Sequence, residues 1–245
     1  MMKNKSTIAR LLAEEDIHVV SKKMDTAYFN IKKRELGLPI WKDEVSKVEE
    51  ELMVCHEIGH ALWTSMDMIK KSEARGLNSS FVNILEDARI EKFVKRKYPG
   101  SVNLFKKGYV ALAARDFFGV ANEGVNSCNL IDRINLFFKG QDGVEFSDDE
   151  RVFVDRVEKL ETEDEVLDLA EELYKYMEEN QKEIREMKEM MLSLVENLML
   201  SLTMPMMENL MKLLIMMGLL GTAALVMKTN LKMVELILVP ILKKK

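Results

Sequence analysis

Residues 55–64 read Cys-His-Glu-Ile-Gly-His-Ala-Leu-Trp-Thr, and the interpretation of the whole chain starts from this stretch. It holds two of the chain's three histidines, His56 and His60, with Glu57 directly after the first. On a helix, residues four apart lie on one face about one turn apart, so both imidazoles can reach the same ion. Glu57 projects to the side and can touch a water molecule on that ion without binding the ion. The H-E-x-x-H pattern therefore predicts a metal site.

The flanking sequence predicts that this motif lies on one amphipathic helix, from about Asp43 to Ser65. Apolar residues recur at helical spacing on both sides of the motif. These are Val45, Val48, Leu52, Cys55, Leu62 and Trp63. A helix would hold the ligands rigidly, as a catalytic metal requires. The alternative is that the two histidines are only packed and hydrogen-bonded on a buried helix face. A glycine such as Gly59 makes a helix less stable than Ala would, by about 1 kcal/mol. Either a closely packed neighbouring backbone or a need for room beside the metal would explain a glycine here.

A second helix after the motif is the expected source of a further ligand. A catalytic zinc site has three protein ligands and an open position for water. His18 is the only other histidine, so we expect the third ligand to be a carboxylate. Residues 79–91 read SSFVNILEDARIE, which predicts a helix capped by Ser79 or Ser80 and ended by Pro99 and Gly100.

Three polar residues share one face of this second helix. Asn83, Glu86 and Asp87 stand at positions i, i+3 and i+4. We predict Glu86 as the third ligand. Asp87 is the alternative ligand, or the acceptor that orients a ligand histidine through its other ring N–H. A solvated acidic surface is the alternative for the whole face, and Arg89 and Glu91 are expected to form a local charge pair.

Taken together, these residues resemble a known group of enzymes. The two helices are similar to those of zincin metallopeptidases of the gluzincin type, in which H-E-x-x-H is followed by a helix that carries a glutamate. The string Asn-Ile-Leu-Glu-Asp-Ala-Arg-Ile-Glu, residues 83–91, resembles the N-x-x-E-D-x-R-x-E segment of predicted peptidases of tailed bacteriophages. It is also similar to the metal-motif region of cobaltochelatase-T-like von Willebrand A proteins, which work with MoxR-type AAA+ ATPases. The resemblance spans residues 26–160. One departure is that the two acids are adjacent, not spaced as E-x-x-x-D.

The resemblance implies a zinc metallopeptidase in which His56, His60 and Glu86 bind zinc. Zinc lowers the pKa of its bound water, and Glu57 as general base would take the proton of this water and pass it to the leaving amine. The candidates for stabilising the oxyanion are Tyr98, Tyr109, Arg89 and His18. The expected partner is a protein or peptide substrate. The alternative is a non-proteolytic, metal-stabilised adaptor or scaffold that works with a MoxR-type AAA+ ATPase.

The rest of the first 186 residues predicts a mostly helical α+β domain that ends in a helical subdomain, and the resemblance implies that its core is zincin-like. Residues 24–41 indicate one or two short strands before a turn at Pro39. Such strands would either pair with an extended substrate or simply cover the helices. Further helices are expected over residues 7–15, 102–118, 130–139, 148–160 and 163–190.

Composition indicates a cytoplasmic protein, or one of the host cytoplasm if the chain is phage-encoded. The net charge is −5, and the globular part has no basic cluster, which argues against nucleic acid as a partner. The two cysteines, Cys55 and Cys128, give no disulfide framework. The N-terminus lacks the apolar stretch of a signal peptide.

Residues 187–245 differ from the rest of the chain, because they hold 12 of its 19 methionines and few acids. The uncharged run from Leu213 to Met227 is shorter than the roughly 17 residues that a membrane span needs, so a membrane role is not expected. An apolar partner-binding helix is one interpretation. A frameshift is the other: Met-Met pairs are coded ATG-ATG, which reads as Asp-Asp one base out of frame. The tail would then be a mistranslated acidic linker.

Overall fold

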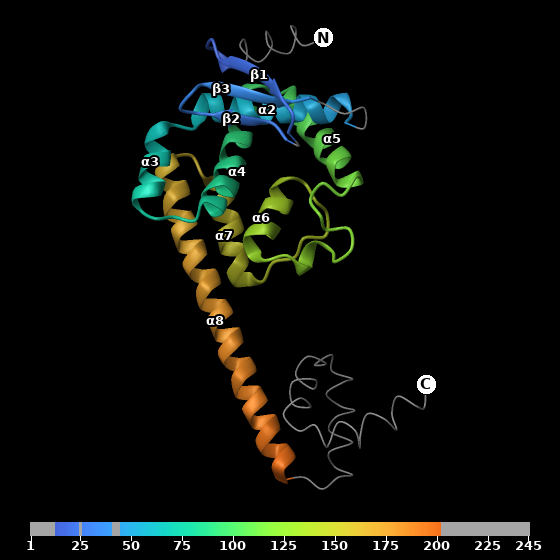
Figure 1. Cartoon of the computed structure of the whole chain (residues 1–245), viewed down its shortest axis with the longest axis vertical. Coiled ribbons are helices and arrows are strands. Elements are labelled where there is room, and N and C mark those ends of the chain that lie inside the picture. Colours follow the sequence, from blue (N-terminus) through green and yellow to red (C-terminus); the bar gives the residue numbers. More distant parts are fainter. Residues whose placement is uncertain (1–12, 25, 41–44, 202–245) are drawn as a thin grey trace. The chain divides into compact units, whose positions relative to one another are not determined.

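The computed structural model describes residues 13–24, 26–40 and 45–201, and in them a small sheet precedes a series of helices (Figure 1). The mostly helical α+β class is therefore confirmed. The strands are β1 (His18–Lys22), β2 (Tyr28–Asn30) and β3 (Glu35–Pro39). The helices are α2 (Lys47–Trp63), α3 (Met66–Ala74), α4 (Ser79–Lys97), α5 (Ser101–Ala114), α6 (Leu130–Phe138), α7 (Asp148–Lys159) and α8 (Glu163–Ser201), with a 3₁₀ turn at Val125–Ser127.

The sheet has the strand order β1-β3-β2, with β3 parallel to β1 and antiparallel to β2. One or two strands were expected in residues 24–41, before a turn at Pro39. Strands β2 and β3 lie there, Pro39 is the last residue of β3, and β1 is an addition. Gly37 lets β2 and β3 pack closely, because a Cβ on Gly37 would lie 2.1 Å from the Tyr28 ring. The three-residue β2 lies at an edge of this sheet.

Helix α2 carries the H-E-x-x-H motif, as predicted, and its first turn is closed by a capping box between Ser46 and Glu49. Two glycines allow close helix contacts. A Cβ on Gly59 would lie 2.6 Å from Cδ1 of Ile90 on α4, and one on Gly108 of α5 would lie 2.7 Å from Cβ of Leu52 on α2. Gly59 is therefore explained by close packing of the neighbouring helix.

Helix α4 occupies the stretch expected for the second helix. Its N-cap is Asn78, whose side chain accepts from the backbone N–H of Ser80, so the prediction of Ser79 or Ser80 as cap is wrong by one or two residues. It ends at Lys97, before Pro99, as predicted. The connection from α2 is not a simple loop, because α3 lies in it and is capped by Ser65.

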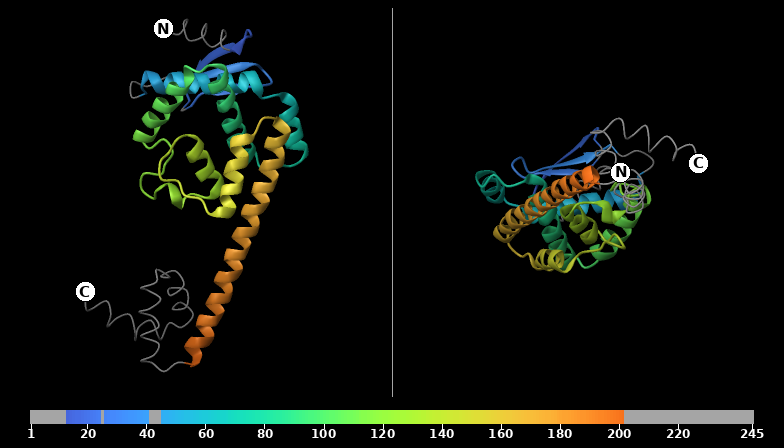
Figure 2. Two further views of the ribbon diagram at one scale, coloured as in Figure 1. Left: turned by 180° about the vertical axis from the view of Figure 1, so that it is seen from behind. Right: turned by 90° about the horizontal axis from the view of Figure 1, so that it is seen from below.

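Two apolar cores lie on either side of the α2–α4 crossing. The first joins the sheet, α2 and α5 and includes Leu36, Leu52 and Phe105. The second joins α4, α6, α7 and the start of α8 and includes Leu85 and Ile134. Helices α4 and α5 both contact α2, and α4 also contacts α6 and α7; Figure 2 shows this arrangement from behind.

The chain divides after Met177, within α8, into units of residues 1–177 and 178–245. Helix α8 continues beyond the expected end at residue 190, to Ser201. The predicted boundary at residue 186 also falls within this helix. The expected start of the first helix and the uncharged run from Leu213 to Met227 lie outside the described residues. Within residues 13–201, leaving out the two short gaps, no helix is long and apolar enough to cross a membrane.

Candidate metal centre

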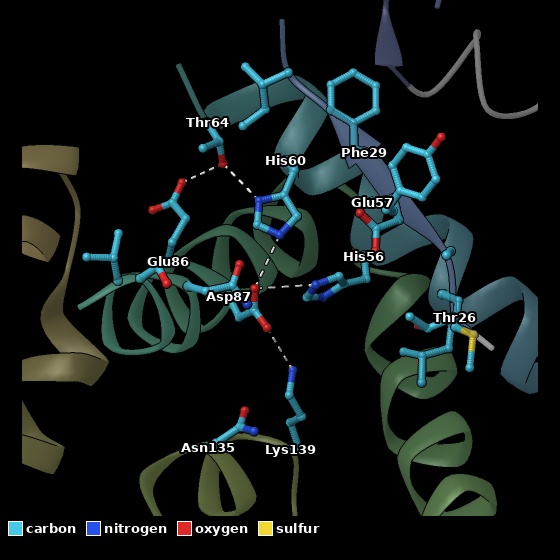
Figure 3. A pocket seen from close by; sticks show the side chains of 18 of the residues that line it. Thr26, Phe29, His56, Glu57, His60, Thr64, Glu86, Asp87, Asn135 and Lys139 are labelled. Carbon is cyan, nitrogen blue, oxygen red and sulfur yellow. Dashed lines mark hydrogen bonds and ion pairs between the residues drawn. The ribbon is translucent and has the colours of Figure 1, made fainter. Parts of the chain in front are cut away.

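Helices α2 and α4 bring three potential ligands together. The Nε2 atoms of His56 and His60 lie 3.4 Å and 3.2 Å from Oδ1 of Asp87. One ligand atom from each residue falls within 4.8 Å of the other two. Figure 3 shows both imidazoles turned toward the Asp87 carboxylate. These three residues can hold a single ion.

Hydrogen bonds at the far side of each ring fix which nitrogen is free. His56 Nδ1 donates to Oε1 of Glu91 at 3.1 Å, and a carboxylate can only accept. His60 Nδ1 lies 3.0 Å from Oγ1 of Thr64, whose own proton is donated to Oε1 of Glu86 at 2.6 Å. The Thr64 oxygen therefore accepts from His60. Both rings carry a proton on Nδ1, which leaves the Nε2 lone pairs available to a metal.

The Asp87 carboxylate adds a buried oxygen to the two imidazole nitrogens. Its Oδ1 is buried and accepts no hydrogen bond, although buried polar atoms almost always have a partner. Burial lowers the pKa of His56, but Asp87 and Glu91 raise it by more, to about 10. The cluster therefore attracts a cation or, without one, a proton. Two imidazole nitrogens and an unbonded carboxylate oxygen fit a divalent transition metal.

The structure places Glu86, the predicted third ligand, away from the imidazoles (Figure 3). Both of its oxygens bind Arg89, with Nε and Nη2 each at 2.7 Å, and Oε1 also accepts from Thr64. Adjacent residues on a helix point about 100° apart, and Arg89, one turn further along, holds Glu86 on its own side. The alternative ligand, Asp87, is the acid that reaches the histidines.

The expected charge pair between Arg89 and Glu91 is not formed. Arg89 is buried against Glu86 and donates to the backbone oxygen of Trp63 at 2.8 Å. Glu91 is buried on the other side, where His56 and Tyr109 both donate to its Oε1. Each of the two residues thus supports a different histidine of the cluster. Arg89 acts on His60 through Glu86 and Thr64, and Glu91 acts on His56 directly.

Glu57, the predicted general base, lines the cavity beside the two histidines. Burial raises the pKa of its carboxyl, while the nearby His56 and His60 oppose that rise. Phe29, on the edge strand β2, lines the same cavity. Glu57 is therefore in place to exchange a proton with a molecule in the cavity without being one of the three ligands.

Two residues outside the predicted set also belong to the cluster. Lys139, at the end of α6, places Nζ 3.4 Å from Oδ2 of Asp87 and 3.2 Å from Oε1 of Glu91. Burial lowers the pKa of Lys139, but Glu91, Tyr109 and Asp87 raise it by more, well above its usual value. Tyr109 was a candidate for stabilising an oxyanion, but its hydroxyl already donates to Glu91.

The cluster opens into a cleft of about 620 Å³, a size typical of ligand sites. Its walls come from β2 and from α2 to α6, and Asn83 contributes to the wall beside Asp87. Met53 and Phe118 make one apolar part of the lining.

No protein-family model, curated protein or solved structure matches this chain. What the site can do is therefore inferred from its own atoms.

Proposed function

We propose that this protein is a zinc-dependent metallopeptidase that hydrolyses peptide bonds in a protein or peptide substrate. One observation carries the proposal. The Nε2 atoms of His56 and His60 converge on the unbonded Oδ1 of Asp87, and Glu57 stands beside them in an open cleft. A purely structural site has no need of an open position or of a carboxylate beside it.

The chemistry divides between the ion and Glu57. Zinc bound by His56, His60 and Asp87 would lower the pKa of a water molecule and polarise a carbonyl group. Glu57 would accept the proton of that water and return it to the amine that leaves. Glu91 and Thr64 would keep the two rings oriented throughout, since each holds one Nδ1 proton.

The placement of the acids supports the likeness to gluzincins. With Asp87 as ligand and Glu91 behind His56, the two acids are spaced as D-x-x-x-E on α4. The gluzincin pattern is E-x-x-x-D, so the spacing is the same and the two residue types are exchanged. The departure noted for the adjacent pair Glu86 and Asp87 disappears, because Glu86 is not part of the cluster.

Strand β2 is the proposed docking edge for the substrate backbone. It pairs with β3 on one side, and its residues Tyr28 and Phe29 line the cleft beside Glu57. An extended peptide added to this edge would run past the metal ligands, as in β-strand addition.

Substitution of Glu57 by Gln tests the proposal. The zinc-loaded variant should keep its metal and lose cleavage of unfolded casein by about 10²-fold or more, because a positioned base contributes rate enhancements of that size. Glu73→Gln is the matched control, since Glu73 lines the same cleft on α3 without touching the ligands. A zinc-loaded wild type that leaves casein intact would favour the metal-stabilised adaptor instead.

A further inference from the structure

Lys139 is a buried cation at the metal cluster, and it comes from α6, an element that supplies no ligand. It is the C-cap residue of α6, and its side chain is only 12% exposed. Its Nζ contacts three oxygens, which belong to Asp87, Glu91 and the hydroxyl of Tyr109. Figure 3 shows the side chain reaching from below toward the Asp87 carboxylate.

The two oxygens of Asp87 face different charges. Oδ1 faces the Nε2 atoms of His56 and His60, while Oδ2 faces Nζ of Lys139 at 3.4 Å. A carboxylate has two oxygens and can bind a metal through one or both. With Oδ2 held by an ammonium group, Oδ1 alone is left for the ion.

Lys139 also contributes to the charge balance of the cluster. Glu57, Asp87 and Glu91 are buried carboxylates around a site that would hold one divalent ion. Together, that ion and Lys139 balance the three negative charges. Without Lys139, Glu91 would keep only Lys95, which is 31% exposed, as an ion-pair partner besides the histidine. A buried charge that loses its partner is strongly unfavourable.

We propose that Lys139 is a positioning residue that holds Asp87 as a one-oxygen ligand and so keeps a coordination position open for water. The inference rests on the proposed metal site. It adds that the helical subdomain, through α6, sets the coordination of an ion whose ligands all come from α2 and α4.

Cobalt tests this role, because its visible absorption reports the number of ligands directly. A Co²⁺ centre with few ligands absorbs strongly, and the bands weaken as further ligands make the site more nearly centrosymmetric. In the full chain loaded with Co²⁺, Lys139→Met should release Oδ2 to the ion as a further ligand and so weaken these bands. Lys139→Arg keeps the charge and should restore them.

Lys95→Met is the matched control, since Lys95 contacts Glu91 at 3.2 Å but is not an ion-pair partner of Asp87. It should leave the spectrum unchanged. An unchanged spectrum in Lys139→Met would overturn the role of Lys139 while leaving the metal site intact. A wild type that binds no Co²⁺ would overturn the metal site itself.

A crystal structure of the cobalt-loaded wild type decides the matter if Lys139→Met does not fold. Binding through Oδ1 alone, with Oδ2 on Lys139, supports the inference. Binding through both oxygens of Asp87 overturns it.

Discussion

Two adjacent acids on α4, Glu86 and Asp87, have different roles in this site. Asp87 faces the two ligand histidines, whereas Glu86 is locked to Arg89 and reaches His60 only through the hydroxyl of Thr64. The chain Arg89–Glu86–Thr64–His60 is one of two supports for the imidazoles, and Glu91 is the other. Asp87 and the acids that support the two histidines thus come from one helix, α4, with Thr64 added from the end of α2.

Replacement of Thr64 by Val should weaken zinc binding. Val keeps the shape but removes the oxygen that accepts from His60 Nδ1 and the proton given to Glu86. Loss of such a support typically costs about 10- to 100-fold in metal affinity. Competition with a chromophoric chelator measures this change. Thr64→Ser keeps the hydroxyl and should bind like wild type, and equal affinities for Val and Ser would show that Thr64 does not orient the ring.

At the residue scale, the sequence predicted that His56, His60 and Glu57 lie together, and the three line one cavity. It did not predict which of the two acids reaches the histidines. The i, i+4 spacing on one amphipathic helix defines the two imidazoles. Choosing between Glu86 and Asp87 needs the rotation of α4 about its axis, which depends on packing. One local signal was present: Arg89 stands three residues after Glu86, a spacing that favours an ion pair and thus removes Glu86 from other roles.

At the scale of elements, the close contact of α2 with α5 gives a stability prediction. Gly108→Ala should destabilise the protein, because the added Cβ would lie 2.7 Å from Cβ of Leu52, an atom that cannot rotate away. The overpacking cost of about 1 to 3 kcal/mol exceeds the gain of about 1 kcal/mol in helix propensity. Urea unfolding measures the change in the free energy of unfolding between wild type and Gly108→Ala.

Gly100→Ala is the control for that measurement. Gly100 is the N-cap of α5, has an ordinary φ of −62°, and has open space where a Cβ would stand. It should leave the unfolding midpoint nearly unchanged. If Gly108→Ala is as stable as Gly100→Ala, the two helices do not approach as closely as described.

A pH-dependent contact joins α4 to the connection between α7 and α8. Arg96 binds both oxygens of Glu161 at 2.7 Å and 2.8 Å, and Lys92 binds one at 3.0 Å. These cations, Arg96 first, lower the pKa of Glu161 to about 2 from its usual 4.5. The contact therefore stabilises the fold above pH 4.5, and this stabilisation is lost as the pH falls toward 2.

Glu161→Gln should accordingly be less stable than wild type at pH 7, with the difference shrinking as the pH is lowered below 4.5. The effect is small because the pair is exposed, and salt should reduce it further. Urea unfolding midpoints at several pH values measure it, with Glu158→Gln on the exposed face of α7 as control. If the stability difference between wild type and Glu161→Gln stays constant down to low pH, the contact of Glu161 with Arg96 and Lys92 does not lower its pKa as described.

Among the elements, those with strong local signals were predicted and those made by distant contacts were not. Capping residues and helical periodicity located α2, α4, α6 and α7 closely. Strand β1 was missed because its register comes from parallel pairing with β3, which is remote in sequence. The nine-residue α3 was missed because it buries little apolar surface of its own, with Met68 as its buried residue.

At the scale of the whole molecule, the site depends on contacts that no local pattern reveals. Lys139 lies 52 residues from Asp87 along the chain and meets it only because α6 packs on α4. A lysine at the end of an amphipathic helix ordinarily faces solvent, so its sequence context gives no sign of burial. The fold class could be predicted from composition and periodicity. The presence of Lys139 beside the carboxylates of Asp87 and Glu91 could not, because it results from tertiary packing.

The zinc content of matched variants tests the central claim most directly. Purified chains are stripped of metal, loaded with zinc and dialysed against a weak chelator, and zinc per chain is then measured. We predict about one zinc for wild type and for Glu86→Gln, and a large loss for His60→Ala and Asp87→Asn, because in our proposal His56, His60 and Asp87 hold the ion. Retention of zinc by Asp87→Asn together with its loss from Glu86→Gln would contradict this account.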